Sequence, residues 1–295
     1  MMAFLVTGAS GFLGKHLTKS LVAQGHNIKA LVRKVPTYYF SKGVINVLGD
    51  LLDSSSLVHA TEGIDIIVHA AAVINSTKKE DFEKVNVYGT QNIVNAAKTN
   101  SVQKIIYIST YDVVLNPKGM YGGSKLKAEQ IIKESGVPYV ILRPNTIYGP
   151  GERQGITELI KLVRKSYVVP MVGSGRAMLQ PIHVSDVCKA VLASANPSIK
   201  NDIFEIGGPD TLTFKQLIEL IAKELGVKRI TVPIPVSLLV AGSWFYNRLA
   251  HQPWNKDKLL NLTKDKSMNI TRMRNEFGIQ PIGVKEGIKE LVKIT

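Results

Sequence analysis

The chain has 295 residues, of which 45% are apolar, and this length and composition suit one α/β domain with a smaller lobe. Its net charge of +14 is spread along both halves without a basic tract, which argues against nucleic-acid binding and indicates mainly a lysine-rich solvated surface, with attraction of anionic ligands or anionic membranes as the alternative. The single cysteine, Cys188, excludes an internal disulfide and is typical of a reducing compartment, so we expect a cytoplasmic protein with a buried, unreactive thiol.

Neither a secretory leader nor a membrane span is expected. The apolar start is short and runs directly into a glycine turn, which indicates a strand. The longest later apolar stretch, 236–246, is too short to cross a bilayer, although it could form an apolar surface helix.

The N-terminal segment has the pattern of a strand, a tight glycine turn and a helix. An apolar run over 3–6 is followed by three glycines at a spacing of three, and then by an amphipathic segment over 12–23. Glycine tolerates positive φ and lets a ligand approach the backbone, and a helix N-terminus presents unpaired N–H groups. A turn without a ligand is the alternative, but this context favours a pyrophosphate site. The expected contacts are Gly8, Ser10, Gly11, Phe12, Leu13 and Gly14.

Two cations follow the second expected strand, 27–32. In a dinucleotide-binding fold this strand end meets the adenosine ribose, where an acidic residue favours NAD and an arginine accommodates a 2′-phosphate. Because Arg33 and Lys34 stand here and no acid does, we expect NADP(H) rather than NAD(H). Two ordinary surface cations are the alternative.

Further strands over 44–48, 65–68, 104–108 and 138–142 alternate with helices. This alternation predicts an α/β fold with a Rossmann-type, doubly wound parallel sheet. His69 follows one of these strands and is expected to be a packed strand-end residue. The small residues after it leave room for a cofactor across the strand ends, and they are Ala70, Ala71 and Ala72.

The chemistry is expected at one tyrosine and one lysine. Tyr121 and Lys125 are four residues apart at the start of an expected helix and therefore share one face. A phenol has an unperturbed pKa of about 10, and a nearby ammonium should lower that pKa. Thr110, which follows the strand 104–108, can hold the substrate oxygen beside the phenol, and Ser109 is the alternative hydroxyl.

Several motifs in this order resemble the short-chain dehydrogenase/reductase family, in particular its extended and atypical branches, the NAD-dependent epimerase/dehydratase-like proteins. They are the Thr-Gly-x-x-Gly-x-x-Gly turn at 7–14, the Tyr-x-x-x-Lys pair at 121–125 and the Arg-Pro-x-x-x-Tyr-Gly-Pro-Gly segment at 143–151. The resemblance extends over nearly the whole chain. It implies an NAD(P)-dependent oxidoreductase or epimerase.

The resemblance also implies roles for single residues. Asp50 would bond the adenine amino group and Leu51 would pack on the ring, although Asp50 could instead cap the following helix. Lys125 would bond the nicotinamide ribose, and Asn86 would lie near the cofactor and this lysine. The family's catalytic hydroxyl aligns with Thr110. The segment that passes the nicotinamide contributes Pro144 and Thr146.

Pro150 and Gly151 mark a boundary in the chain. We expect an NAD(P)-binding domain over 1–150, completed by 181–206, and a substrate-side lobe with closing helices over 151–295.

The substrate class is less specified than the fold. Nucleotide-sugar enzymes of the family place an asparagine where Thr146 stands and an arginine where Leu179 stands, and both contact the sugar nucleotide. Their absence argues against that class, although another arginine could substitute. The candidate substrate contacts are Arg153, Arg176, Tyr148 and Trp244.

Three functions remain open. The first is an NADP(H)-dependent oxidoreductase that transfers a hydride to or from a carbonyl or alcohol, with Tyr121 as acid and base. The second is a nucleotide-sugar epimerase or dehydratase that uses NAD. The third is a non-catalytic NADP(H)-binding structural or sensor subunit that docks on a complex or a membrane through 236–246. We expect a small-molecule substrate, no metal and, by resemblance only, a homodimer.

Overall fold

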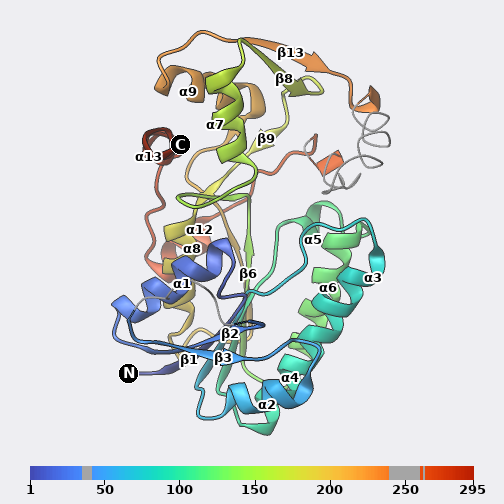
Figure 1. Cartoon of the computed structure of the whole chain (residues 1–295), viewed down its shortest axis with the longest axis vertical. Coiled ribbons are helices and arrows are strands. Elements are labelled where there is room, and N and C mark those ends of the chain that lie inside the picture. Colours follow the sequence, from blue (N-terminus) through green and yellow to red (C-terminus); the bar gives the residue numbers. More distant parts are fainter. Residues whose placement is uncertain (35–41, 239–259, 262) are drawn as a thin grey trace.

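The computed structural model describes residues 1–34, 42–238, 260–261 and 263–295 (Figure 1). Its larger part is a seven-stranded sheet of parallel neighbours in the order β11-β6-β5-β4-β1-β2-β3. Because the order reverses between β1 and β4, the expected Rossmann-type doubly wound sheet is confirmed. The strands are β1 Ala3–Thr7, β2 Asn27–Val32, β3 Val44–Leu48, β4 Ile66–His69, β5 Lys104–Ile108, β6 Tyr139–Pro144 and β11 Asp202–Ile206.

Apolar side chains alternate between the two faces of this sheet, as the two-residue period of a strand requires. On β5, Ile105 and Tyr107 pack on one face, whereas Ile106 and Ile108 pack on the other. Both faces are covered by helices (Figure 1). The helices α1 Phe12–Ala23, α8 Val184–Ser194 and α12 Thr271–Phe277 cover the Ile106 face, and α2 Ser54–Thr61, α4 Gly89–Thr99 and α6 Met120–Lys133 cover the Ile105 face.

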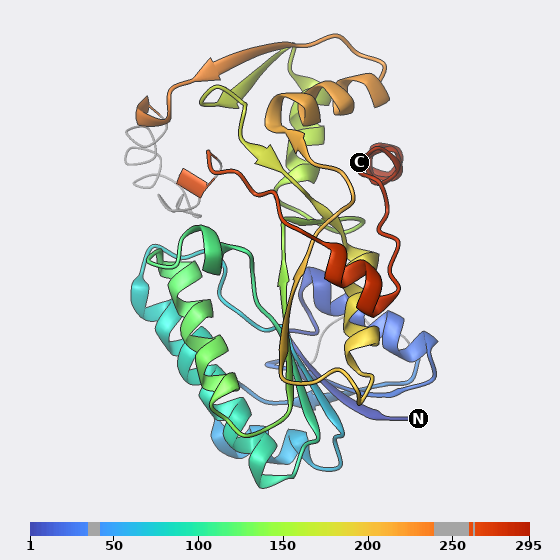
Figure 2. The ribbon, with the colours of Figure 1, turned by 180° about the vertical axis from the view of Figure 1, so that it is seen from behind.

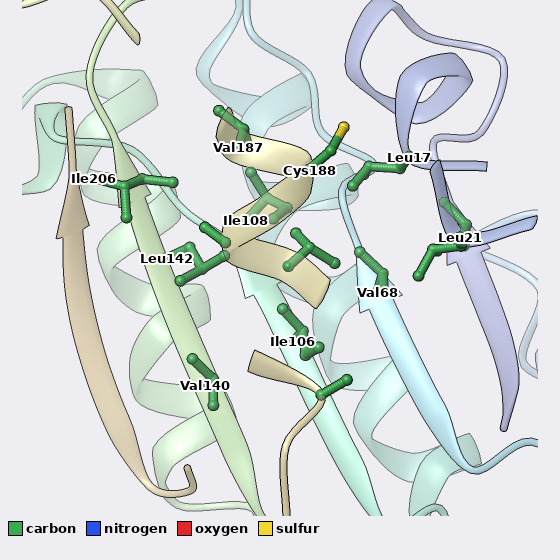
Figure 3. Packing of buried hydrophobic residues seen from close by; sticks show 14 of the residues in the cluster. Leu17, Leu21, Val68, Ile106, Ile108, Val140, Leu142, Val187, Cys188 and Ile206 are labelled. Carbon is green, nitrogen blue, oxygen red and sulfur yellow. The ribbon is translucent and has the colours of Figure 1, made fainter. Parts of the chain in front are cut away.

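The core on the Ile106 face joins α1 and α8 to the middle strands. Figure 3 shows Leu17 and Leu21 from α1 and Cys188 from α8 gathered beside Val68 and Ile106. Cys188 is 4% exposed, and burial raises the pKa of its thiol to about 12. The expected burial of this thiol is confirmed, and a raised pKa disfavours the reactive thiolate.

The chain before β5 winds through three helical segments. The segment α3 Lys79–Phe82 leads into a π-helix, η1 Glu83–Tyr88, which leads into α4. A π-helical turn widens the helix locally and is frequent at functional sites. Here it carries the buried Asn86.

The small lobe stands beyond the carboxyl end of β6 (Figures 1 and 2). Its core is formed by the amphipathic helices α7 Ile156–Lys165, α9 Phe214–Glu224 and α13 Val284–Ile294. Its short strands pair as β8 Val168–Val172 with β13 Ile230–Ile234, β9 Met178–Leu179 with β12 Leu212–Thr213, and β7 Ile147–Tyr148 with β10 Ile182–His183. Between β10 and β12 the chain returns to the large sheet to form α8 and β11.

Tyr148 is fully buried in the small lobe's core. A Cβ on Gly287 of α13 would lie 2.3 Å from the Tyr148 hydroxyl, so the helix packs directly on this ring. A substrate contact at Tyr148 stays a prediction. None of the helices in the described ranges has the length and hydropathy to span a bilayer.

Candidate functional site

The glycine turn after β1 forms a backbone cradle at the start of α1. Gly8 has a φ of +70°, and a Cβ there would lie 2.8 Å from the Ala71 nitrogen that follows β4. A Cβ on Gly14 would lie 2.1 Å from the Gly8 oxygen, so α1 can cross the turn only without a side chain. Gly11, the N-cap of α1, has no side chain to accept from the first N–H groups of the helix. These groups and the close backbones fit the pyrophosphate of a dinucleotide.

His69 fixes the strand end that faces this cradle. Thr7 Oγ1 lies 2.8 Å from His69 Nδ1 and accepts from the Ala71 N–H at 3.1 Å. Thr90 Oγ1 lies 3.0 Å from His69 Nε2 and donates to the Asn86 carbonyl oxygen at 2.6 Å. Because Thr90 gives its proton to that carbonyl, Nε2 carries the ring proton and Nδ1 accepts from Thr7.

Burial lowers the pKa of His69 to about 3, so the ring is neutral at physiological pH. The expected packed strand-end histidine thus positions the backbone of Ala71. The other residues predicted for the turn and the strand end lie around it: Ser10 is exposed, and Phe12, Leu13, Ala70 and Ala72 are half-buried.

The residues predicted for the adenosine end lie at the carboxyl ends of β2 and β3. Arg33 is exposed directly after β2, and Asp50 is half-buried after β3. Asp53, not Asp50, caps α2, since its side chain accepts from two backbone N–H groups of the first turn. The alternative role of Asp50 as the helix cap is therefore wrong. Leu51 is buried against Gly89 at the start of α4.

Tyr121 and Thr110 meet at the carboxyl end of β5. The Thr110 hydroxyl accepts from the Asp112 N–H at 3.2 Å, so its proton stays available to the nearby Tyr121 oxygen. Burial and, to a lesser degree, the Asp112 carboxylate raise the pKa of Tyr121, whereas the bond from Thr110 acts to lower it. The sequence predicted a lowered pKa through Lys125. The structure shows a raised one.

Lys125 does not lower the pKa of Tyr121, because its ammonium group is directed to β5. Its Nζ donates to the Ile108 carbonyl oxygen at 2.7 Å and lies 4.0 Å from the centre of the Tyr107 ring. Burial lowers the pKa of Lys125 to about 7, although the nearby Glu129 carboxylate acts to raise it. Lys125 thus lies one turn below Tyr121 with its ammonium group against β5.

A buried carboxylate network supports this pair, and sequence reasoning missed it. Glu129 accepts from the Ser109 hydroxyl at 2.5 Å and from the Arg143 guanidinium at 2.9 and 2.6 Å. The signal available in the sequence was a carboxylate four residues after Lys125, on the same helical face. Because the Ser109 hydroxyl is committed to Glu129, Thr110 is the strand-end hydroxyl that remains for a substrate oxygen.

Asn86 links the loop after β4 to the helix that carries Tyr121. Its side-chain oxygen accepts from the Val73 N–H at 2.8 Å, and its amide donates to the Val73 carbonyl at 3.0 Å and to the Ser124 hydroxyl at 2.9 Å. Ser124 directly precedes Lys125. The structure therefore brings Asn86 to the helix that carries the lysine, as expected.

Pro144 and Thr146 lie at the end of β6, where Asn145 fixes the backbone. The buried Asn145 side chain accepts from the Thr146 N–H at 2.8 Å and donates to the Lys266 carbonyl, so the closing segment is held against the site. Arg153 and Arg176 are exposed, and Trp244 lies outside the described residues. Within the described ranges, no group of three His, Cys, Asp or Glu side chains could hold a metal ion.

The sequence model of the NAD dependent epimerase/dehydratase family matches residues 4–207. Among curated relatives, a 4-hydroxy-2-methyl-3-oxo-4-farnesyl-3,4-dihydroquinoline-1-oxide ketoreductase of Stigmatella aurantiaca is 26% identical over 94% of this chain and 91% of its own. A ceramide reductase of Caulobacter vibrioides is 28% identical over 81% of this chain and 75% of its own.

A solved structure, MoeE5 in complex with UDP-glucose and NAD, has the same fold. It aligns with a TM-score of 0.80 at 23% identity, over 99% of this chain and 97% of that one. The resemblance to the extended short-chain dehydrogenase/reductase branch is confirmed. The chain belongs to the NAD dependent epimerase/dehydratase family and is an NAD(P)-dependent oxidoreductase or epimerase.

Proposed function

We propose that this protein is an NADP(H)-dependent oxidoreductase that transfers a hydride to or from the carbon of a lipophilic carbonyl or alcohol. The observation that carries the proposal is the closeness of the Thr110 hydroxyl and the Tyr121 phenol, at the carboxyl edge of the sheet that also bears the cradle of α1. A proton donor at this edge would lie beside the reacting carbon of a bound substrate.

The chain's own residues would donate, accept and position the proton of the reaction. When bound, the nicotinamide supplies or accepts the hydride. Because the pKa of Tyr121 is raised, its hydroxyl is protonated at neutral pH and suits donation to a carbonyl oxygen, which is the reductive direction. Thr110 would orient that oxygen. Lys125, with a pKa of about 7, can take up or release a proton at Nζ near neutrality.

Two observations favour a lipophilic substrate. Thr146 and Leu179 stand where nucleotide-sugar enzymes of the resembled branch carry an asparagine and an arginine, and Leu179 is buried. The Stigmatella and Caulobacter relatives are named for a farnesyl-bearing dihydroquinoline and for ceramide, which are both long-chain lipophilic compounds.

The test of the mechanism is Tyr121→Phe. Removing the proton donor should lower the rate constant of ketone reduction on the order of 10²–10⁴-fold while cofactor binding is retained. Tyr111→Phe is the matched control, since the Tyr111 hydroxyl donates to the Ser267 carbonyl oxygen at 3.0 Å and is not assigned to the proton. Reduction by Tyr121→Phe at the wild-type rate would falsify the mechanism.

The cofactor preference can be tested at Arg33. We expect NADP+ to raise the melting temperature of the wild-type protein more than NAD+ does at equal concentration. Arg33→Ala should weaken NADP+ binding about tenfold to a hundredfold, the range of a lost charged hydrogen bond, and leave NAD+ binding unchanged. Lys98→Ala, on the exposed side of α4, is the control. A larger rise with NAD+ in the wild type would overturn the preference.

An NAD-dependent nucleotide-sugar epimerase is the second candidate, because MoeE5, which shares the fold, binds UDP-glucose and NAD. Incubation with UDP-glucose would then give the C4 epimer without net oxidation of added cofactor. Purified protein that retains NAD(H) and converts UDP-glucose would replace the oxidoreductase proposal. A purely structural role is disfavoured, since such a protein has no need of the Tyr121–Thr110 pair.

A further inference from the structure

The outer face of the β8–β13 sheet in the small lobe is apolar and exposed. The two strands are parallel, and their register places Val168 beside Ile230 and Pro170 beside Val232. Residues paired in this way point to the same face of a sheet. Val168, Ile230 and Val232 are 46%, 50% and 42% exposed, whereas Val169, between Val168 and Pro170 on β8, is buried in the lobe's core.

Two further exposed apolar residues lie near the ends of these strands. Tyr167, directly before β8, is exposed, and so is Leu238, four residues after β13. A two-stranded sheet with one bare apolar face is marginal unless something covers that face. We name this surface, made of Val168, Pro170, Ile230 and Val232, the lobe patch.

Four cationic side chains precede the two strands of the lobe patch, and few carboxylates lie near them in sequence. Arg164 and Lys165 precede β8, and Lys228 and Arg229 precede β13. The sequence has no aspartate or glutamate between 159 and 185. In the part of the chain that the structure describes, neither arginine pairs with a carboxylate. Arg164 donates to the Val292 carbonyl and Arg229 to the Val163 and Arg164 carbonyls, so both guanidinium groups lie against helices of the lobe, whereas Lys165 and Lys228 are exposed next to the strands.

We propose that the lobe patch docks on an anionic phospholipid bilayer. Aliphatic side chains would enter the boundary between headgroups and acyl chains, and the exposed Lys165 and Lys228 would face lipid phosphates. The net charge of +14 adds long-range attraction to such a surface.

Charge complementarity favours a bilayer over a second copy of this chain. In a symmetric pair joined through the lobe patch, the four cations of one copy would meet those of the other, and like charges brought together repel. A bilayer with anionic headgroups neutralises them instead. Figures 1 and 2 place β8 and β13 at the end of the small lobe away from the large sheet, so docking there leaves the nucleotide cradle free.

This inference does not rest on the proposed activity, and the experiment is therefore binding alone. Wild-type protein is sedimented with vesicles of phosphatidylcholine containing about 30% phosphatidylglycerol, and with pure phosphatidylcholine vesicles, at low and high salt. We expect binding to the anionic vesicles only, weakened by salt because the cations are exposed.

Two variants divide the lobe patch into its parts. Val168→Thr/Ile230→Thr/Val232→Thr keeps the branched shape of each strand residue and removes apolar area, and Lys165→Glu/Lys228→Glu reverses two flanking charges. Each should weaken vesicle binding by about tenfold or more, from roughly 1 kcal/mol per cation near an anionic surface and the lost apolar burial. Far-UV circular dichroism and the melting temperature verify that each variant is folded.

The matched controls lie on the large domain. Ile45→Thr/Leu48→Thr removes exposed aliphatic side chains from β3, and Lys84→Glu/Lys98→Glu reverses two exposed charges near α4. These variants should bind vesicles like the wild type.

Three results would overturn the proposal. In the first, the wild-type protein does not bind anionic vesicles. In the second, the control variants lose as much vesicle binding as the lobe-patch variants. In the third, the lobe-patch variants change only the oligomeric state measured by sedimentation velocity. The last result would assign the surface to contact between copies. Should the triple threonine variant fail to fold, the charge variant and the lipid dependence of the wild type decide alone.

Discussion

Among single residues, Tyr121 and Lys125 show how burial moves two neighbouring titratable groups toward their neutral forms. An environment with little water disfavours both a phenolate and an ammonium, so the pKa of Tyr121 rises and that of Lys125 falls to about 7. Both shifts keep charge out of the end of β5. A neutral phenol and a lysine near its titration point suit a site that must donate a proton at neutral pH.

The lowered pKa of Lys125 should appear in the pH dependence of stability. The folded group has a pKa of about 7 and the unfolded group the ordinary lysine value of 10.5, so the unfolded chain holds more protons between these pH values. The free energy of unfolding therefore gains a contribution that rises with pH from 7 toward 10.5. Urea denaturation at pH 7 and 8.5 should show a smaller rise in Lys125→Met than in the wild type. Lys127→Met, an exposed lysine on the same helix, should leave the rise unchanged. Equal slopes in all three proteins would show that Lys125 is not perturbed.

At this scale the residue types of the site could be predicted from the sequence, and their orientations could not. Four-residue spacing indicates that Tyr121 and Lys125 share a helical face. It does not indicate that Lys125 Nζ turns to the Ile108 carbonyl, because that acceptor lies on a strand distant in sequence. The hydrogen bonds of His69 join two strands and a helix. They could not be predicted either, because the partners Thr7 and Thr90 are distant from His69 in sequence.

At the scale of elements, helix α6 and strand β6 are joined by the buried Glu129–Arg143 pair. The Glu129 carboxylate is 1% exposed and accepts from both guanidinium nitrogens and from Ser109. Such a pair adds little folding stability compared with apolar packing in its place. Loss of one partner, however, leaves the other charge buried without its counter-ion. The pair therefore makes the position of α6, and of the two site residues on it, sensitive to one strand residue.

Arg143→Met should lower the free energy of unfolding by about 3 kcal/mol, because Glu129 is left buried without its cation. The double variant Glu129→Gln/Arg143→Met should recover part of this loss, since it removes the uncompensated charge. Lys127→Met, which breaks the exposed pair with Glu83, should cost about 1 kcal/mol or less. A double variant as unstable as the sum of its two single variants would show that the residues do not stabilise each other. Chemical denaturation measures all four.

Element types were predicted well where one chemical signal dominates, as in the glycine turn that ends β1. The sequence predicts a helix between the strands 65–68 and 104–108, but it does not indicate the π-helical turn within that segment. Apolar residues at helical spacing indicate which side is buried, but the extra residue of a π-turn is set by what Asn86 must reach on other elements.

On the scale of the whole molecule, 37 lysines and arginines oppose 23 aspartates and glutamates. This excess favours contact with anionic partners, and its self-repulsion opposes the compact state. Ion pairs such as Lys161–Glu158 lie at the surface and offset little of it.

Salt should therefore stabilise the protein. Raising NaCl from about 0.01 M to about 0.15 M shortens the screening length from roughly 30 Å to roughly 8 Å and weakens the repulsion between distant cations. We expect the melting temperature to rise over this range, measured by differential scanning fluorimetry. Sucrose of equal osmolality serves as the control for general solvent effects. A fall in melting temperature would mean that attractive surface pairs outweigh the net repulsion.

The three hydrogen bonds of Asn86 have a consequence for how motion passes through the site. They clamp the Val73 peptide on one side and the Ser124 hydroxyl on the other, so the loop after β4 and the helix bearing Tyr121 cannot separate without exposing a buried amide. A ligand that displaces this loop would pull on the helix through a single side chain. The backbone proton of Val73 should accordingly exchange with deuterium slowly in the native protein and rapidly in Asn86→Ala, at a position where no regular strand or helix protects it.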